Sequence, residues 1–328
     1  MPRSFAATLL ATLALGLGLA PTAQAAPATV AVTAGNDVYT FRVDGTRPLR
    51  LTSTSGGDEG YETWVAHHGA STVAYQTRLG AYRYSVVLRR GRKQSLPFAA
   101  WQRRRGSARW TSFGAPAFSA DGKRLATVCV KGTTRGICLY DLKRRTLKRI
   151  VRCACLHDFG LPPRLSWSRD GRWMAFNDGE GSVYRVDVRR KRIAKVFDDQ
   201  EGNTVAHPTI SPDGSRIAFA MELLSTPVEG QPIRVLDVAT RAQRDLLPPH
   251  GPNDEFGFPS TRGLFRAPSF SPDGRELLVA FHGIAGASVP GFPSGFYAVP
   301  VDGGAPRKLL EATYEQLNTA GTSTSWGS

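Results

Sequence analysis

The sequence predicts an all-β protein assembled from repeated four-stranded units, and two observations carry that prediction. A short unit occurs four times, in which an apolar strand ends at Ser, a turn closes on Asp-Gly, and a second apolar strand follows. The four copies span residues 116–127, 164–176, 208–219 and 268–279. The two ends of the chain also look like complementary parts of one such unit. Self-similarity of this kind is the signature of a repeat architecture.

The Ser-x-Asp-Gly turn has a clear physical basis. Its aspartate accepts hydrogen bonds from amides of the same turn, and its glycine adopts the positive φ that other residues tolerate poorly. The glycines are Gly122, Gly171, Gly214 and Gly274. We therefore expect a tight hairpin at each of these positions.

Residues 1–25 predict a secretory signal peptide. They carry one positive charge at Arg3, an apolar run over residues 5–20, and small residues at Ala23 and Ala25. This order predicts cleavage after Ala25 and export to the periplasm, the cell envelope or the extracellular space. The apolar run is too short for a lasting transmembrane anchor. We expect residues 26–328 to form a single domain.

Each unit is predicted to hold four strands, named a to d in chain order. In one unit these are residues 116–119, 124–130, 137–142 and 147–152, and in the next 165–168, 173–177, 182–187 and 192–197. An aspartate recurs where strand c ends, at Asp141, Asp187 and Asp237, where it would open another tight turn. Residues 62–98 form a weaker copy, in which His67 and His68 stand near the place of the Asp-Gly turn. These histidines could be ligands, although replacement turn residues are the simpler interpretation.

The two ends predict how the repeat array closes. The N-terminal part supplies strands b, c and d (29–33, 37–43 and 48–52) but lacks strand a, whereas residues 322–328 resemble an isolated strand a. A unit built from both ends would close a ring without a long exposed edge. With five internal units, the sequence predicts a six-bladed β-propeller of four-stranded antiparallel blades, and we expect a monomer.

Four cysteines in an exported chain predict two disulfides. Cys129 and Cys138 would face each other across a hairpin. Cys153 and Cys155 would then pair locally, which is sterically awkward, so other pairings remain open. A zinc site formed by all four is disfavoured because the chain lacks two separate Cys-x-x-Cys pairs.

The repeat resembles the WD40-like repeats of TolB-type β-propellers. The matching residues are the Ser-x-Asp-Gly turns, the segment from Tyr184 to Asp187, and the Asp302 to Gly304 segment before a fourth strand. The resemblance covers nearly the whole predicted domain and implies the propeller fold. It implies little about activity, because similar repeats occur in periplasmic scaffold proteins, peptidase propellers and polysaccharide lyases. The separate N-terminal α/β domain of TolB is lacking, which argues against a role inside a Tol-Pal complex.

Propeller geometry places the a–b and c–d turns on one face of the disc, which we call the short-turn face. The b–c turns and d–a linkers lie on the other, the long-loop face. The net charge of +15 is expected to gather on the short-turn face. There a basic ring would attract an anionic polymer or lipid surface, unless its members are solvated turn tips. Nucleic acid is disfavoured because few aromatics interleave with the basic turns. The predicted ring comprises Arg90, Lys143, Arg144, Arg145, Arg189, Arg190, Lys191 and Arg192.

Long loops on a rigid scaffold are common binding sites. The expected loops are residues 99–114, 223–231, 248–267 and 282–295. Candidate contacts with a protein partner are the basic and aromatic side chains of this face, namely Arg103, Arg104, Arg105, Phe256, Phe258, Phe265 and Phe292.

An enzymatic alternative uses His207, Glu222 and His282, which could converge near the channel as metal ligands or as general acid and base. The chain lacks a Gly-x-Ser-x-Gly elbow, a phosphate-binding loop and a dinucleotide fingerprint. The sequence therefore favours a non-catalytic binding or scaffold module without a cofactor, for an envelope or extracellular protein or an anionic glycopolymer. A hydrolase or lyase of acidic polysaccharide, with a divalent metal as an option, is the alternative.

Overall fold

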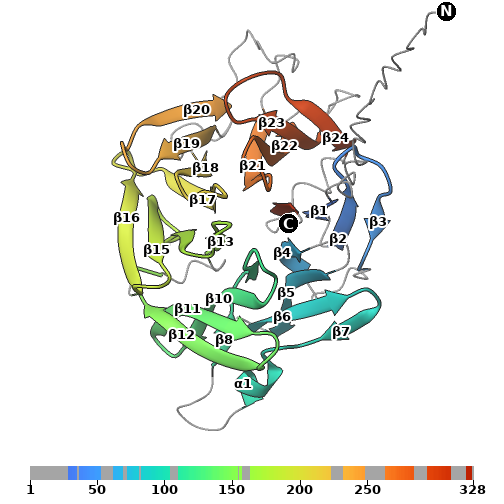
Figure 1. The fold of residues 1–328 in the computed structure, drawn as a ribbon, viewed down its shortest axis with the longest axis vertical. Coiled ribbons are helices and arrows are strands. Elements are labelled where there is room, and N and C mark those ends of the chain that lie inside the picture. Colours follow the sequence, from blue (N-terminus) through green and yellow to red (C-terminus); the bar gives the residue numbers. More distant parts are fainter. Residues whose placement is uncertain are drawn as a thin grey trace, which may run out of the picture.

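The structure is a computed structural model in which the strands form a closed ring of six antiparallel sheets (Figure 1). These sheets are the blades of a propeller, as the repeats predict. The described residues are 29–34, 37–52, 62–68, 72–80, 83–103, 110–153, 155–156, 163–222, 232–247, 263–283, 294–311 and 323–326. The predicted signal peptide lies outside them. Within these segments, every helix is too short or too polar to span a bilayer.

Blade one is built from both ends of the chain, which confirms the predicted closure. The C-terminal strand β25 (Ser323–Trp326) pairs antiparallel with β1 (Thr29–Ala34), in a register that sets Trp326 opposite Val30. The sheet continues through β2 (Asp37–Arg42) to the short edge strand β3 (Leu49–Arg50). Figure 1 shows β25 at the centre of the ring beside β1.

The other blades run from the centre outward in chain order. Blade two comprises β4 (Glu62–His68), β5 (Thr72–Gly80), β6 (Arg83–Arg90) and β7 (Lys93–Ser95). Blade three comprises β8 (Ser112–Phe113), β9 (Ala117–Phe118), β10 (Arg124–Lys131), β11 (Thr134–Asp141) and β12 (Thr146–Arg152). Blade four comprises β13 (Ser166–Trp167), β14 (Trp173–Asn177), β15 (Ser182–Asp187) and β16 (Arg192–Asp198). Blade five comprises β17 (Thr204–Ile210), β18 (Arg216–Glu222), β19 (Ile233–Asp237) and β20 (Gln243–Leu247). Blade six comprises β21 (Gly263–Phe270), β22 (Glu276–Gly283), β23 (Gly295–Pro300) and β24 (Arg307–Glu311).

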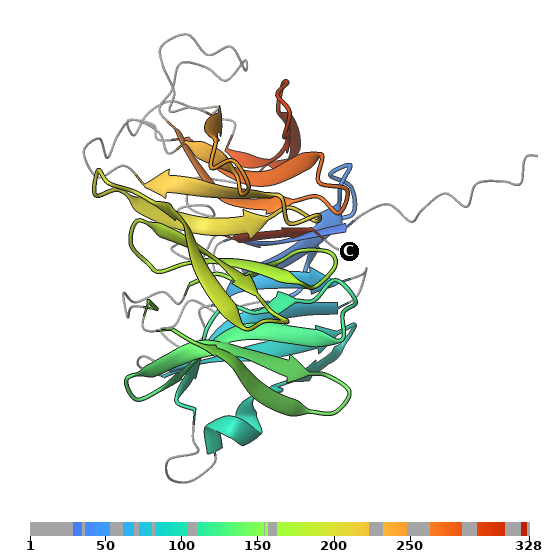
Figure 2. The same cartoon turned by 60° about the vertical axis from the view of Figure 1, so that its left-hand side comes forward.

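Two predicted loops contain regular structure. Residues 99–114 include the helix α1 (Ala99–Arg103), at the outer edge of the ring in Figures 1 and 2, and the strand β8. The expected loop 248–267 ends early because β21 begins at Gly263. The ladder of β21 shifts register between Arg266 and Ser269, so the strand passes Pro268 through a β-bulge. The sequence predicts that this unit starts at residue 268, so the strand begins five residues earlier than expected.

The Ser-x-Asp-Gly turns have the predicted hydrogen bonds. In blade five, the Ser211 hydroxyl donates to Asp213 Oδ1 (2.5 Å), and the same oxygen accepts from the Ser215 amide (3.0 Å). The Arg216 amide donates to Ser211 Oγ (2.9 Å), and Gly214 has a φ of 75°. The turns of blades three, four and six repeat this arrangement.

The aspartates that end strand c cap the next turn, as predicted. Asp141 Oδ1 accepts hydrogen bonds from the amides of Lys143 (3.0 Å) and Arg144 (2.7 Å). Asp237 Oδ1 does the same for Ala239 (3.0 Å) and Thr240 (2.8 Å). These carboxylates therefore hold turns together.

The core consists of six buried clusters, each shared by two neighbouring blades in the described part of the chain. In the cluster between blades five and six, Phe265 and Phe281 both come from blade six, and their rings lie 4.9 Å apart. Between blades six and one, Trp326 joins Val30 and Phe296. Closure of the ring thus buries the apolar side chain of Trp326 between blades six and one.

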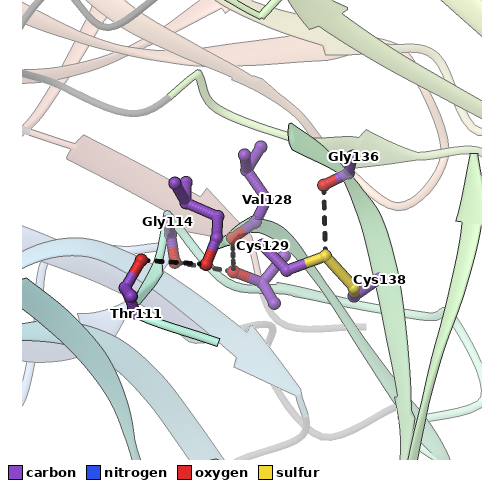
Figure 3. Close-up of a disulfide and its surroundings, with 8 residues drawn as sticks. Thr111, Gly114, Val128, Cys129, Gly136 and Cys138 are labelled. Carbon is purple, nitrogen blue, oxygen red and sulfur yellow. Dashed lines mark hydrogen bonds between the residues drawn. A yellow bond between two sulfur atoms is a disulfide. The ribbon is translucent and has the colours of Figure 1, made fainter. Parts of the chain in front are cut away.

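Two disulfides are present, Cys129–Cys138 and Cys153–Cys155. Cys129 lies opposite Gly136 in the β10–β11 ladder, so its bond to Cys138 runs diagonally across the hairpin. Figure 3 shows this bridge beside the carbonyl oxygen of Gly136, which lies 3.4 Å from Cys129 Sγ. The local second pair, which the sequence left open, links two residues with Cα atoms 5.1 Å apart.

Candidate functional site: the channel mouth on the short-turn face

The short-turn face carries both kinds of turn that the sequence assigns to it. A groove of about 560 Å³ is lined by Gly122 and Lys123 from an a–b turn, and by Lys143 and Arg144 from the c–d turn of the same blade. Arg90, which ends β6 of blade two, lines it as well. The groove is therefore a basic surface between blades two and three.

A cavity of about 300 Å³ occupies the centre of the ring and opens among the a–b turns. The innermost strands of all six blades line it, through residues such as Ala66, Ala117, Ser166, Thr209, Ser269 and Ser325. Ser325 Oγ accepts the His67 amide (3.1 Å), and Ser166 Oγ accepts the Ile210 amide (3.1 Å). These bonds join neighbouring blades at the equivalent position, so the cavity wall is part of the rigid ring.

Arg164 is the principal charged group of the cavity. It precedes β13 in blade four, is 9% exposed, and donates a hydrogen bond from Nη2 to the carbonyl oxygen of Thr324 in β25. Burial lowers the pKa of Arg164 to about 10, so the guanidinium stays charged at neutral pH. Its Nη1 is buried and has no hydrogen-bond partner among the described residues. Arg164 thus crosses the ring to the C-terminal strand while keeping unused donor capacity.

In the described part of the cavity wall, three further side chains carry a buried nitrogen without a hydrogen-bond partner. These are the indole Nε1 atoms of Trp167 and Trp326 and the Nδ1 atom of His67. Burial, followed by the charge of neighbouring His68, lowers the pKa of His67 to about 4, so its ring is neutral at pH 7. Its Nε2 lies 3.4 Å from Thr29 Oγ1. A neutral imidazole has one N–H, and in the tautomer protonated at Nδ1 the His67 ring is a further unpartnered donor beside those of Arg164, Trp167 and Trp326.

His207, one of the three catalytic candidates, lies half-buried in β17 with a φ of 55°. Burial, together with the charges of Arg164 and Arg266, lowers the pKa of His207 well below its ordinary value. The ring is therefore neutral and belongs to the same electropositive centre as Arg164. A neutral histidine next to two guanidinium groups is poorly placed to accept a proton as a general base.

The other catalytic candidates lie on different strands. Glu222 ends β18 and pairs with Thr204, and His282 lies in β22 opposite Leu264. Both side chains are outside the described residues, so the predicted convergence with His207 remains a prediction. Within the described parts, no cluster of three or more His, Cys, Asp or Glu side chains has the arrangement of a metal site.

The eight residues of the predicted basic ring are all exposed. Arg144 lies 3.9 Å from the Asp141 carboxylate and Arg190 lies 3.7 Å from Asp187, so the turn aspartates partly compensate these two charges. The groove described above gathers three members of the ring, Arg90, Lys143 and Arg144. The basic turns and the cavity thus occupy one face.

Of the predicted partner contacts, Arg103 is exposed at the end of α1. Phe265 is 1% exposed and packs in the core between blades five and six. Its assignment as a surface contact was wrong, because its position lies inside β21 rather than in a loop. Arg104, Arg105, Phe256, Phe258 and Phe292 lie outside the described residues.

Sequence reasoning missed Arg164, Trp167 and Trp326 as a set, because they come from blades four and one. One signal was available: Trp167, Trp326 and His67 each stand near the end of an innermost strand, so propeller symmetry places them around one channel.

No known family profile matches the chain. An uncharacterized protein of Agrobacterium fabrum is 27% identical over 165 residues, which cover 49% of this chain and 52% of that protein. The chain therefore matches about half the length of this curated relative.

Solved structures resemble the whole ring. TolB of Acinetobacter baumannii has a TM-score of 0.59 at 18% identity, covering 92% of this chain and 66% of that one. A TolB-type protein of Agrobacterium tumefaciens has a TM-score of 0.56 at 14% identity, covering 87% and 89%. An oligogalacturonate lyase in complex with manganese has a TM-score of 0.50 at 14% identity, covering 84% and 70%. At these identities the likeness establishes the fold alone: the chain has the six-bladed propeller fold of TolB-like proteins.

Proposed function

We propose that this protein is an exported, non-catalytic binding or scaffold module of the cell envelope or extracellular space. It engages an envelope or extracellular protein, or an anionic glycopolymer, through the short-turn face. A propeller held by six interblade cores is a rigid platform, and such platforms bind through what their faces present.

One observation carries the proposal: the central cavity opens on the same face of the disc that presents the basic turns. Exposed cations of one sign raise the local potential and attract anionic partners, and the attraction weakens as salt screens it. A cavity at the centre of that field supplies the shape that a charged ring alone lacks. Attraction and specificity would therefore act on the same partner.

Export is supported by the predicted signal peptide and by two disulfides, which persist in oxidising compartments. The likeness to TolB supports protein binding only through the fold.

The alternative, a hydrolase or lyase of acidic polysaccharide, draws support from the fold likeness to the oligogalacturonate lyase. It requires His207 to act on a substrate. His207 is half-buried, and desolvation together with the charges of Arg164 and Arg266 lowers its pKa, which disfavours uptake of a proton. We therefore prefer the binding role.

The test is a crosslinking pull-down of the mature protein from cells, washed first at low and then at high salt, with mass spectrometry and glycan analysis. A matched pair of variants locates the face. Lys143→Gln/Arg144→Gln/Arg145→Gln removes part of the basic ring, and Arg149→Gln/Arg152→Gln removes exposed charges from β12. We expect the first variant to lose the partner and the second to retain it. Equal recovery with both variants contradicts the assignment of the short-turn face. Turnover of a captured polymer would establish the enzymatic alternative.

A further inference from the structure

The central cavity has an unusual balance of hydrogen-bonding groups. Its described lining includes the guanidinium of Arg164, two indoles, an imidazole and Arg169, and it contains no aspartate or glutamate. Three of the four unpartnered nitrogens, those of Arg164, Trp167 and Trp326, can only donate. The described lining therefore carries unpartnered donors and lacks a carboxylate that could neutralise the buried Arg164. Three aspartates of the turns, Asp170, Asp213 and Asp273, line an adjoining groove outside it.

The energetic consequence is that the cavity favours an anion. A buried donor left without a partner costs about 1–3 kcal/mol, and a buried unpaired charge costs more. The fold tolerates this at Arg164 because Nη2 is bonded to the Thr324 carbonyl oxygen. An anion that accepts from Nη1 would offset the remaining cost. The reduced pKa of Arg164 has the same origin, because only desolvation shifts it.

The shape and composition of the cavity wall indicate which class of anion would fit. A guanidinium presents parallel N–H donors that match the two oxygens of a carboxylate. Each indole adds one further N–H donor. The wall also presents apolar side chains such as Phe118, Ile210 and Phe270, which suit an organic group more than a bare inorganic ion. A volume of about 300 Å³ accommodates one sugar-acid unit or one chain end.

We propose that the central cavity is a carboxylate-binding site in which Arg164 is the anchoring residue and Trp167, Trp326 and His67 complete the donor set. The carboxylate belongs either to a uronic acid unit or to a peptide chain end. This proposal rests on the proposed function only in placing binding at the short-turn face, and it adds that the group recognised there is a carboxylate.

The site also couples to ring closure. Arg164 belongs to blade four, and it donates to the carbonyl oxygen of Thr324 in β25. The hydroxyl of Thr324 in turn donates to the carbonyl oxygen of Ala267 in blade six. A carboxylate held by Arg164 and Trp326 would therefore bridge blade four and the C-terminal strand. Ligand binding is then expected to stabilise the closed ring, because a ligand that binds only the folded state raises its stability.

The experiment is calorimetric titration of the mature protein with sodium galacturonate and with N-acetylalanine, each compared with its neutral methyl ester. We expect at least one acid to bind about tenfold or more tightly than its ester, and to raise the melting temperature. Arg164→Gln is expected to weaken binding at least about tenfold, whereas Arg152→Gln, on the outer strand of blade three, leaves it unchanged.

Trp167→Phe removes one donor and keeps an aromatic ring, so it tests the site even if Arg164→Gln fails to fold. We expect it to weaken binding of the acid and not of the ester. Galacturonate binding alone identifies a uronic acid, N-acetylalanine alone identifies a chain end, and binding of both means that the carboxylate itself is read. Equal binding of acid and ester, or no heat from either acid up to about 50 mM, overturns the proposal. A partner captured in the pull-down without carboxylate binding would leave the scaffold role intact.

Discussion

Removal of Trp326 tests the closure of the ring. Trp326 is 8% exposed and packs with Val30 and Phe296 between blades six and one. Replacing a buried tryptophan with alanine costs about 3–5 kcal/mol, so we expect Trp326→Ala to lower the free energy of unfolding by about 4 kcal/mol. Leu49→Ala is the matched control in the same blade, because Leu49 is 58% exposed; its effect should stay within about 0.5 kcal/mol.

Deleting residues 323–328 goes further, because it also removes the four residue pairs between β25 and β1. At about 1 kcal/mol net for each of about four ladder hydrogen bonds, the total loss approaches about 8 kcal/mol. That figure lies within the whole stability of a typical domain, so we expect the truncated chain to unfold without a cooperative transition. Urea unfolding followed by far-UV circular dichroism measures both changes. Unchanged midpoints for Trp326→Ala and for the truncated chain would show that blade one does not depend on its C-terminal strand.

Four further predictions concern a turn glycine, the two disulfides, and two groups that titrate in acid. Gly214→Ala should lower the melting temperature more than Gly91→Ala. Both glycines have a positive φ, but a Cβ at Gly214 would meet Trp173 at 2.7 Å, whereas a Cβ at Gly91 would meet no atom within 4 Å. Equal losses of stability would mean that the positive φ alone matters. Replacing Cys129 and Cys138 by alanine should cost about 2.5 kcal/mol or more, and replacing Cys153 and Cys155 should cost less, because the second bridge closes a much shorter loop; the reverse order in urea titrations would contradict this. Burial lowers the pKa of His67 to about 4, below its usual 6.5, so stability should fall by about 3 kcal/mol as pH drops through that window, and His67→Gln should flatten the decline. Asp213 acts at lower pH. Partial burial raises its pKa, but hydrogen bonds from Ser211 and Ser215 lower it to about 2, so its contribution to stability is present above about pH 4 and is lost as the pH falls through about 2. If the stability of Asp213→Asn declines below pH 4 as steeply as that of the unchanged protein, this role is refuted.

The fold could be predicted because its determinants are local and repeated. Each Ser-x-Asp-Gly turn depends on residues within five positions of one another, as the bond from the Arg216 amide to Ser211 shows. The Cys129–Cys138 bridge spans one hairpin, so the same short-range reasoning reached it. The pairing of β25 with β1 is long-range, but two incomplete units at opposite ends of a repeat have one simple solution.

The cavity could not be predicted in the same way. Arg164 and Thr324 are 160 residues apart, and their contact depends on the diameter of the ring and on the rotamer of one long side chain. Whether a nitrogen is left without a partner depends on every neighbour, and no sequence pattern records it. Phe265 shows the converse error, because a bulged strand past Pro268 looks like a loop until its ladder is seen.

Site-specific photocrosslinking in cells tests most directly whether the short-turn face binds the partner. The crosslinker is placed at Lys143 or Arg190, in c–d turns, and for comparison at Thr133 or Glu180, in b–c turns of the same two blades; all four are exposed. If the short-turn face is the binding surface, Lys143 and Arg190 will capture a defined partner and the other two positions will not. Capture only from Thr133 and Glu180 would place the partner on the long-loop face and contradict the account.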